Sequence, residues 1–297
     1  MKIHKALVGV LYCGEADYEE CMAAINAQTG VDVEVVVIRD RPNKTAHEEL
    51  YEAFMKRAEA VDFFAKIDAD MIVREKDFLA KVGRLFEENP KARMVTVPVL
   101  DYFSGKLIRG LNCFRHDVTW SKSWDAVFVD RKPVGQREVL IAHHLAPAAL
   151  HCFRVGGFHS YHYGIHRGLK MRTALLADND RGMRRFHVSN YFDLVGNAPC
   201  AVSVDRRLLL ARYGMLVALL GGVEPGVVEY SNPALRVQYQ RELRLLTSEQ
   251  LLPLIRKAEK AIPLRLNLAL HQTRLSSVVL RRLRAVAHQV AQLSAVK

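Results

Sequence analysis

Residues 62–70 read DFFAKIDAD, and this stretch decides the fold. The apolar run FFAKI is short and contains aromatic residues, which is typical of a buried strand. Two aspartates, Asp68 and Asp70, end the run abruptly. In open α/β sheets, ligands collect beyond the carboxyl ends of the strands, so acidic side chains at this point indicate a binding site. The stretch therefore predicts a strand that ends at a ligand-binding edge of a sheet.

The segments on both sides of this stretch alternate between strand and helix patterns. Strand-like runs occupy residues 6–12, 31–38, 62–67 and 93–100. Helical spacing of apolar residues covers residues 17–28 and 77–88, and a third helix is expected to open at Thr45, which forms a capping-box pattern with Glu48. Four strands separated by helices predict an α/β fold with a mostly parallel central sheet and helical cover.

The pattern changes after residue 101. Residues 106–115 are typical of a hairpin arm or a further strand, and residues 116–170 are loop-rich and dense in His, Arg and Trp. Functional sites commonly lie on such irregular segments. Beyond residue 169 helical spacing dominates, with prolines between the helices. We therefore predict an α/β domain over residues 1–170 and a basic helical C-terminal region over residues 171–297.

The composition is that of a folded protein. The chain has 297 residues, of which 50% are hydrophobic and 25% charged, and this excludes a disordered tail or a collagen. Five scattered cysteines without a CxxC pair predict neither a disulfide framework nor a thiolate zinc site, so a reducing, cytoplasmic setting is expected. The N-terminal apolar run reaches Glu15 too soon for a signal peptide. The most apolar later stretch, residues 208–220, is too short for a membrane span.

Positive charge is concentrated at the C-terminus. The net charge is +11, and residues 250–297 hold nine Lys or Arg against one Glu, a net +8. Apolar residues there recur at steps of three and four: Leu275, Val279, Leu283, Val286, Val290 and Leu293. That spacing predicts an amphipathic helix, which either contacts the anionic inner face of a membrane or packs on the domain with a solvated basic face. The segment contains no aromatic residue to stack on bases, so no nucleic-acid partner is expected.

The Asp68 and Asp70 carboxylates carry the chemistry of the predicted edge. Two neighbouring carboxylates repel one another unless a cation lies between or beside them. Carboxylate oxygens suit Mn²⁺ or Mg²⁺, which bind few protein groups and complete their coordination with water and phosphate oxygens. A surface turn is the alternative interpretation of an Asp-x-Asp sequence. At the end of a buried strand, we expect a metal site.

Three motifs occur in order along the first part of the chain: residues 19–29 (EECMAAINAQT), the turn VVVIRD that ends at Asp40, and residues 63–90 (FFAKIDADMIVREKDFLAKVGRLFEENP). Together they resemble the nucleotide-sugar half of family 2 glycosyltransferases of the GT-A fold, over about residues 5–115. The resemblance implies a GT-A-like domain that transfers a sugar from a nucleoside diphosphate sugar to a hydroxyl acceptor. It further implies inversion at the transferred carbon and a glycan or lipid-linked acceptor, with a growing cell-surface glycan as the expected acceptor.

The resemblance also implies roles for particular residues. Tyr12 and Asp40 would contact the nucleotide, Asp68 the ribose or the metal, and Asp70 the metal. The turn at Asp40 has Arg39 where the family has a second acid, so the nucleotide base is not specified.

The proton acceptor and a further metal ligand are expected in the loop-rich segment. Inversion requires a carboxylate that accepts the proton of the attacking hydroxyl. Asp125 is the first candidate for this role and Asp130 the second. Each is alternatively an exposed loop acid. In this family a downstream His completes the metal shell, and His143 and His144 follow an apolar run at an expected strand end. Because neighbours on an extended strand point to opposite sides, one of the two is expected to face the metal.

Basic and histidine-rich residues follow. His162 and His166 have the i, i+4 spacing of a helical zinc clasp, but no acid lies between them, and a zinc site is not expected there. Arg154, Arg167 and Lys170 either grip a diphosphate or an anionic acceptor, or are solvated surface residues. Two rival functions stay open: metal-dependent phosphoryl or nucleotidyl transfer, which an Asp-x-Asp edge also suits, and a non-enzymatic membrane or nucleic-acid adaptor that uses the basic tail.

Overall fold

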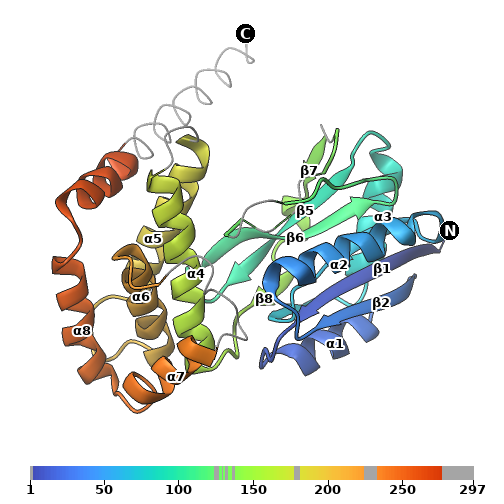
Figure 1. Cartoon of the computed structure of the whole chain (residues 1–297). Helices are drawn as coiled ribbons and strands as arrows, with labels where there is room; N and C mark the ends of the chain where they lie inside the picture. Colours follow the sequence, from blue (N-terminus) through green and yellow to red (C-terminus); the bar gives the residue numbers. More distant parts are fainter. Residues whose placement is uncertain are drawn as a thin grey trace, which may run out of the picture.

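The computed structural model describes residues 3–123, 127–128, 130, 133–135, 138–176, 181–223 and 233–275. An α/β half and a helical half lie side by side (Figure 1). The α/β half contains β1 (His4–Tyr12), α1 (Tyr18–Asn26), β2 (Val31–Arg39), α2 (Asn43–Lys56), β3 (Phe63–Lys66), β4 (Met71–Val73), α3 (Phe78–Glu88), β5 (Met94–Asp101), β6 (Lys106–Arg115), β7 (Val139–Ile141) and β8 (Ala149–His151). The helical half contains α4 (Gly157–Leu176), α5 (Arg181–Asn197), α6 (Arg206–Leu219), α7 (Pro233–Glu242) and α8 (Ser248–Lys260).

The central sheet is mixed, and the prediction of a mostly parallel sheet is wrong. Its strand order is β2-β1-β3-β6-β5-β8-β4, with β7 paired to β5. β1 runs parallel to β2 and β3, whereas β6 is antiparallel to both β3 and β5. The chain returns from β5 to β6 through a tight turn with Gly105 at φ 64°. So short a connection can join only antiparallel neighbours, and it inserts β6 into the middle of the sheet.

Alternating side chains of β1 bury both faces of the sheet. Ala6, Val8 and Val10 belong to the apolar core that contains residues of α1 and α3. Leu7 belongs to a second core, which contains Leu50 and other residues of α2. A strand covered on both faces reads as a continuous apolar run, which is why this part of the sequence predicted strands reliably.

The helix expected to open at Thr45 begins two residues earlier, at Asn43. The N-cap position is Pro42, and no side-chain cap bond is present there, so Thr45 and Glu48 lie inside the helix. The Ala46 amide donates to the Pro42 carbonyl at 2.8 Å. Pro42 itself has φ −51° and ψ 140°, so it lies just outside the helix, and its carbonyl accepts from the first turn without a capping box.

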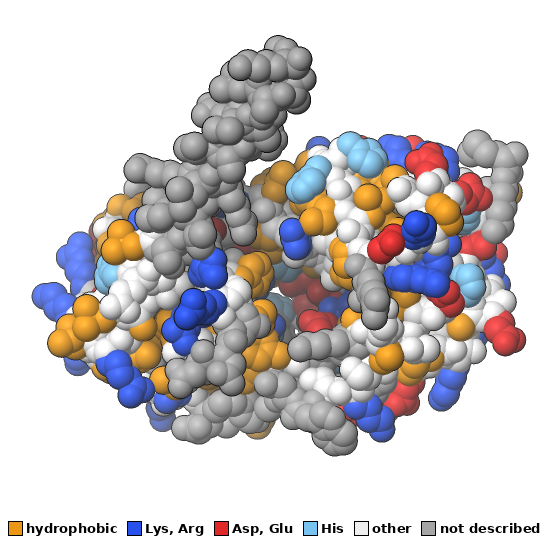
Figure 2. Space-filling view, turned by 90° about the horizontal axis from the view of Figure 1, so that it is seen from above, with side chains coloured by type: hydrophobic (Ala, Val, Ile, Leu, Met, Phe, Trp, Pro, Cys, Tyr) orange, Lys and Arg blue, Asp and Glu red, His pale blue; other side chains and the backbone are white. Residues whose placement is uncertain are grey.

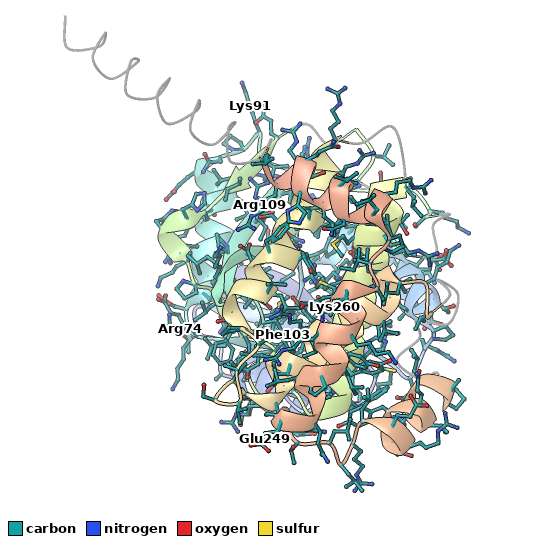
Figure 3. The ribbon with its side chains drawn as sticks, turned by 90° about the vertical axis from the view of Figure 1, so that its left-hand side faces the viewer. Arg74, Lys91, Phe103, Arg109, Glu249 and Lys260 are labelled. Carbon is teal, nitrogen blue, oxygen red and sulfur yellow. The ribbon has the colours of Figure 1, made fainter. Side chains whose placement is uncertain are left out.

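The helical half is built on close contact between α4 and α6. Gly164 and Gly214 lie where the two backbones meet, since a Cβ on either would come within 2.3 Å of a carbonyl oxygen of the other helix. The predicted domain boundary at residue 170 falls inside α4, which continues to Leu176. Figure 3 looks onto this half, with α8 in front and Glu249 and Lys260 near its two ends.

The two halves share a core at the turn after β5. Phe103 is fully buried and belongs to the apolar cluster formed mainly by the helical half. Its ring stacks on Tyr163 of α4, with the centroids 4.0 Å apart. Within the described residues, no helix has the length and apolar character needed to cross a membrane. The expected amphipathic helix lies outside the described residues beyond Leu275.

Candidate active site

A cavity of about 360 Å³ lies at the carboxyl ends of β1 and β3, between the sheet and α4. Because these strands are parallel, their ends meet at the same edge, as the sequence around Asp68 and Asp70 predicted. Figure 2 shows a hollow between the two halves with acidic side chains inside it. The sheet side contributes acidic residues to the lining together with Lys66 and Arg109, and α4 contributes basic residues and histidines.

Four acidic side chains gather on the sheet side: Glu15, Asp17, Asp68 and Asp70. Burial, together with the charges of Asp70 and Asp68, outweighs the backbone hydrogen bonds and raises the pKa of Glu15 to about 7. Burial and Asp70 also raise the pKa of Asp17, which is fully buried. Such raised pKa values indicate a negative field that a cation would relieve. Sequence reasoning missed Glu15 and Asp17, although both follow the first strand directly.

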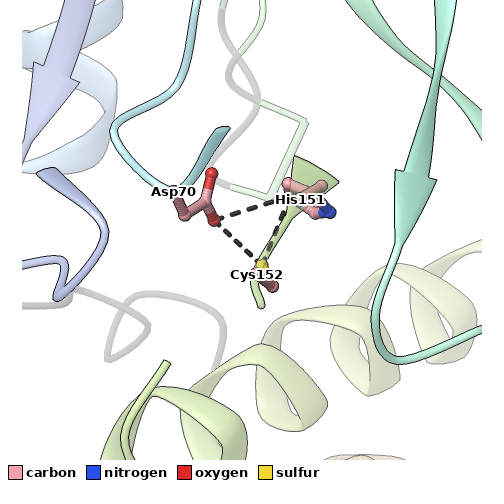
Figure 4. Close-up of side chains that lie close together, drawn as sticks. All are labelled: Asp70, His151 and Cys152. Atoms are coloured by element: carbon pink, nitrogen blue, oxygen red, sulfur yellow. Dashed lines mark hydrogen bonds and ion pairs between the residues drawn. The ribbon is translucent and has the colours of Figure 1, made fainter. Parts of the chain in front are cut away.

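The two aspartates after β3 have different environments. Asp68 lies 3.1 Å from the Lys66 Nζ atom through its Oδ1 atom, so its charge is matched by a largely buried ammonium group. Asp70 instead faces His151 and Cys152 at the end of β8 (Figure 4). The Oδ1 atom of Asp70 is buried and has no hydrogen-bond partner among the described residues. Asp70 therefore has a carboxylate oxygen available for a ligand.

His151 is oriented by a buried carboxylate behind it. Its Nδ1 atom lies 2.7 Å from Oδ1 of Asp101, and an ionised carboxylate only accepts, so Nδ1 carries the proton. The Nε2 atom then points towards Asp70, with 3.5 Å between Nε2 and Oδ2. Burial acts to lower the pKa of His151, but the carboxylates of Asp70 and Asp101 outweigh it and raise that pKa. Burial acts to raise the pKa of Asp70, and the His151 charge outweighs it and lowers that pKa.

This arrangement fits a divalent cation. A histidine that donates its other ring nitrogen to a carboxylate is the usual form of a metal-ligating histidine. Asp70, His151 and Cys152 place one possible ligand atom each within 4.8 Å of one another. The unpartnered Asp70 oxygen supplies a further position. Sequence reasoning missed the position of His151 beside Asp70 because β8 is three residues long and gives no periodic signal.

The structure does not bring His143 and His144 to this cluster, and it corrects the prediction that one of them faces the metal. β7 ends at Ile141, and both histidines lie in the 3₁₀ turn His143–Leu145 rather than on an extended strand end. Both are exposed, and neither is among the described residues that line the cavity. His151, seven residues after His144, is the histidine that lies beside Asp70.

Asp130 lines the cavity but is held by three donors. Its Oδ1 atom lies 3.4 Å from Lys66 Nζ and 3.2 Å from His47 Nε2, and it accepts from the Tyr51 hydroxyl at 3.2 Å. Burial acts to raise the pKa of Asp130, but the charges of Lys66 and His47 outweigh it and keep that pKa well below its usual range. A carboxylate stabilised in this way is a weak base. Asp125 lies outside the described residues.

The predicted nucleotide contacts occupy different positions. Tyr12 lines the cavity and packs on Tyr18 with ring centroids 4.1 Å apart. The Arg39 guanidinium lies over both rings. Asp40 has a left-handed backbone with φ 50°, is exposed, and is not among the described lining residues. The structure therefore places Tyr12 at the cavity and Asp40 outside it, at the end of β2.

One face of α4 forms the basic wall of the cavity. The lining residues recur at helical spacing: His159, His162, Tyr163, His166, Arg167 and Lys170. Burial, together with the neighbouring Arg167 charge, lowers the pKa of Lys170 to about 8. Burial and the nearby positive groups also lower the pKa of His166. These shifts indicate a positive field that favours a bound anion.

His187 on α5 lies in the same positive field, and its burial makes the stability of the fold depend on pH. It is 4% exposed, and neither ring nitrogen has a hydrogen-bond partner among the described residues. Burial, with Lys170 and Arg167, lowers its pKa to about 4. Because the folded-state pKa is below the unfolded value, the unfolded chain gains the proton first, and stability falls as the pH drops below about 6.5.

We expect His187→Phe to reduce the loss of unfolding free energy that occurs as the pH falls below about 6.5. Between pH 6.5 and pH 5, the lowered pKa of the buried histidine reduces the free energy of unfolding by about 2 kcal/mol. The variant should therefore lose about 2 kcal/mol less unfolding free energy than the unmodified chain when urea denaturation is compared at pH 7.5 and pH 5. An equal loss in both proteins would contradict the assignment.

Comparison with known proteins adds two distant likenesses. No protein-family model matches the sequence, and no curated protein matches it. The chain is similar to the mannosyltransferase PcManGT from Pyrobaculum calidifontis, solved with GDP-Man and Mn²⁺, at 14% identity and a TM-score of 0.33, covering 88% of this chain and 86% of that one. It is similar to A197 from STIV at 14% identity and a TM-score of 0.29, covering 37% of this chain and 64%, less than two thirds, of that one. Neither TM-score reaches 0.5, so neither likeness carries a conclusion about this chain.

Proposed function

We propose that the chain is a GT-A-like, metal-dependent glycosyltransferase that moves a sugar from a nucleoside diphosphate sugar to a hydroxyl acceptor. The observation that carries the proposal is the pairing of Asp70 with His151 at the carboxyl end of β3, inside a cavity that is also lined by Arg167 and Lys170 of α4. A nucleotide sugar has the matching chemistry, because its diphosphate is anionic and binds a divalent cation. The motifs that resemble family 2 glycosyltransferases lead to the same edge of the sheet.

We assign the metal to residues on the sheet side of the cavity and the diphosphate to basic residues of α4. Asp70 and His151 would hold Mn²⁺ or Mg²⁺, and a metal bound there neutralises charge on the departing diphosphate. Imidazole ligation favours Mn²⁺ over Mg²⁺. Arg167 and Lys170 stabilise the same anionic group from the α4 side. Tyr12 offers an aromatic face to the nucleotide, and Asp68 accepts from the ribose while Lys66 holds it in place. Asp40 remains a proposed nucleotide contact from outside the cavity lining.

The proton acceptor is proposed among the two loop aspartates. An efficient base needs a pKa close to the working pH. Asp130 is bound by Lys66, His47 and Tyr51, which stabilises its ionised form and weakens it as a base. Asp125 is therefore preferred over Asp130, with attack from the face opposite the leaving group and inversion at the transferred carbon. Asp130 then serves to fix its loop against α2 and β3.

Product analysis tests the reaction class. A panel of nucleotide sugars is incubated with the full chain, with and without Mn²⁺, and the products are separated by chromatography. We expect Mn²⁺-dependent release of a nucleoside diphosphate together with free sugar or a glycoside. Release of pyrophosphate or inorganic phosphate instead would establish phosphoryl or nucleotidyl transfer and overturn the proposal. No turnover of any donor in the presence of acceptor extracts and Mn²⁺ would also overturn it.

The acceptor is proposed to be a glycan or a lipid-linked acceptor, reached at the cytoplasmic face of a membrane. Residues 264–275 are helical, and Leu264, Leu268 and Leu275 share one side of them at 73%, 52% and 66% exposure. Arg265 and Arg274 are exposed on the same segment. Exposed leucines beside arginines match an anionic lipid surface, which attracts basic residues and takes up apolar side chains.

Vesicle flotation tests this contact. We expect the chain to float with vesicles that contain anionic phosphatidylglycerol at low salt and to stay in solution with purely zwitterionic vesicles. Leu264→Asp with Leu268→Asp should reduce the bound fraction at least about fivefold, since each change removes apolar burial and adds repulsion. As a matched control, Val237→Asp changes an exposed apolar residue on α7 and should leave binding intact. Equal binding to both vesicle types would contradict the membrane contact.

A further inference from the structure

The thiol of Cys152 lies in the candidate metal cluster, where neither composition nor residue spacing placed a cysteine ligand. Its Sγ atom is 3.1 Å from Oδ2 of Asp70 and 3.4 Å from Nε2 of His151. The third side of this triangle, between Nε2 and Oδ2, measures 3.5 Å. Figure 4 shows the three side chains converging from β8 and the turn after β3. Oxygen, nitrogen and sulfur atoms therefore face one point.

The backbone holds Cys152 in this position. Its amide donates to the Asp70 carbonyl at 2.8 Å, so the two residues are tied together through the main chain as well. Its φ of 62° is left-handed, a conformation that costs a residue with a Cβ about 1–2 kcal/mol. Surrounding structure must compensate that cost, and the side chain is 2% exposed. The sulfur is thus directed at Asp70 by a specific and unfavourable local geometry.

The other buried cysteines have different surroundings. Cys113 on β6 belongs to the apolar core, and Cys21 on α1 approaches the Asp68 carbonyl at 3.7 Å. Among the cysteines in the part of the chain that the structure describes, Cys152 is the one whose sulfur joins a carboxylate and an imidazole in a metal-ligating cluster. A cysteine that served only to fill space would need neither neighbour.

The triangle has the size of a metal site. Bonds of about 2.3 Å to sulfur and 2.0–2.2 Å to nitrogen and oxygen place neighbouring ligand atoms about 3.4–3.6 Å apart in a tetrahedron. The observed separations of 3.1, 3.4 and 3.5 Å need only small adjustments. Hard cations such as Mg²⁺ favour oxygen ligands, whereas thiolate and imidazole favour borderline cations such as Zn²⁺ and Co²⁺.

We propose that Cys152 is a third protein ligand beside Asp70 and His151, so that the cluster is a mixed oxygen, nitrogen and sulfur site selective for Zn²⁺ or Co²⁺ over Mg²⁺. This deepens the proposed function and rests on it, because it names the metal class of the same site. On binding, the Cys152 thiol and the Nε2 atom of His151 each release a proton to solvent, and the freed electron pairs on sulfur and nitrogen form the bonds to the cation. No electron is transferred. Mn²⁺, which also accepts imidazole, binds with intermediate affinity.

Cobalt titration tests the sulfur ligand directly. The full chain, reduced and then freed of reductant under anaerobic conditions, is titrated with Co²⁺ and followed by absorption spectroscopy. We expect a near-ultraviolet thiolate-to-cobalt charge-transfer band that saturates at one equivalent. Cys152→Ser should abolish the band and weaken Co²⁺ binding at least about tenfold. Cys13→Ser, which removes another cavity-lining thiol, should leave the band intact. Co²⁺ binding without the band, or a band that persists in Cys152→Ser, would overturn the proposal.

Two further measurements separate the possible failures. X-ray absorption of the Zn²⁺-loaded unmodified chain should show a sulfur shell at about 2.3 Å, and this readout does not depend on whether Cys152→Ser folds. A shell of oxygen and nitrogen alone would overturn the sulfur ligand. Mn²⁺-dependent donor turnover without a sulfur shell leaves the proposed function standing and removes this inference. A sulfur shell without turnover of any donor leaves the metal site standing and removes the glycosyltransferase proposal.

Discussion

Asp70→Asn should reduce Mn²⁺-dependent release of nucleoside diphosphate at least about 100-fold, because it removes the carboxylate that would hold the metal against the departing charge. The substitution keeps the size of the side chain and leaves an amide oxygen near His151. Turnover is measured by product chromatography at saturating donor, and Mn²⁺ affinity by titration calorimetry. Both should fall together, whereas far-ultraviolet circular dichroism should stay unchanged.

Asp68→Asn is the matched control, since it makes the same change two residues away. Asp68 pairs with Lys66 and is not part of the cluster of Asp70, His151 and Cys152. We therefore expect Mn²⁺ affinity within about threefold of the unmodified chain, with the effect confined to the KM for the donor. Equal losses of Mn²⁺ affinity in both variants would mean that the two aspartates share the metal. Full activity of Asp70→Asn would remove the metal site.

Gly164→Ala should lower the free energy of unfolding by about 3 kcal/mol, which is a large effect for the addition of one methyl group. A Cβ at this position would lie 1.9 Å from the Ala211 carbonyl oxygen and 2.8 Å from the Met215 nitrogen. Both are backbone atoms of α6, so α4 must move as a whole to relieve the contact. Urea denaturation followed by circular dichroism measures the loss.

Gly196→Ala is the control, because it makes the same substitution at a helical glycine that has open space around it. Gly196 lies near the end of α5, and a Cβ added there would have no atom within 4 Å other than those of its own chain neighbours and helix backbone. Alanine is a better helix former than glycine, so the variant should be as stable as the unmodified chain or more stable by up to about 1 kcal/mol. If Gly164→Ala proves equally stable, the close packing of α4 on α6 is wrong.

Loss of helix packing should also affect the cavity. α4 carries Arg167 and Lys170 on the wall opposite the acidic residues. A shift of α4 away from α6 displaces this basic wall relative to Asp70. We therefore expect Gly164→Ala to raise the KM for the donor even at temperatures where the variant remains folded.

Most of the strand and helix pattern of the first hundred residues could be predicted because it is local, although the short strand β4 was not predicted. β1, β2, β3 and β5 fall on the apolar runs of the sequence, and α1 and α3 on the segments with helical spacing. Each of these elements is decided by neighbours along the chain, through burial on both faces of the sheet or on one face of a helix. The position of Asp68 and Asp70 at a strand end follows from the same local pattern.

The place of β6 in the middle of the sheet and the partner of Asp70 could not be predicted in this way. The tight turn at Gly105 places β6 beside β5, but the pairing of β6 with β3 is a long-range contact, and strand order leaves no periodic trace in the sequence. His143 and His144 were the more obvious ligands because they follow an apolar run. β8 is too short to give such a signal, yet it pairs with β4 and carries His151 to Asp70.

The amino-acid pattern alone establishes an α/β half, a helical half, and two aspartates at the carboxyl end of a buried strand. Folding in three dimensions selects the side chains that meet those aspartates: Lys66 beside Asp68, and His151 with Cys152 beside Asp70. Asp70 and Cys152 are 82 positions apart, and their contact depends on the pairing of two three-residue strands. Local sequence fixes the conformation of a segment through its nearest neighbours, but contacts between distant segments depend on how whole elements pack, which is a property of the assembled chain.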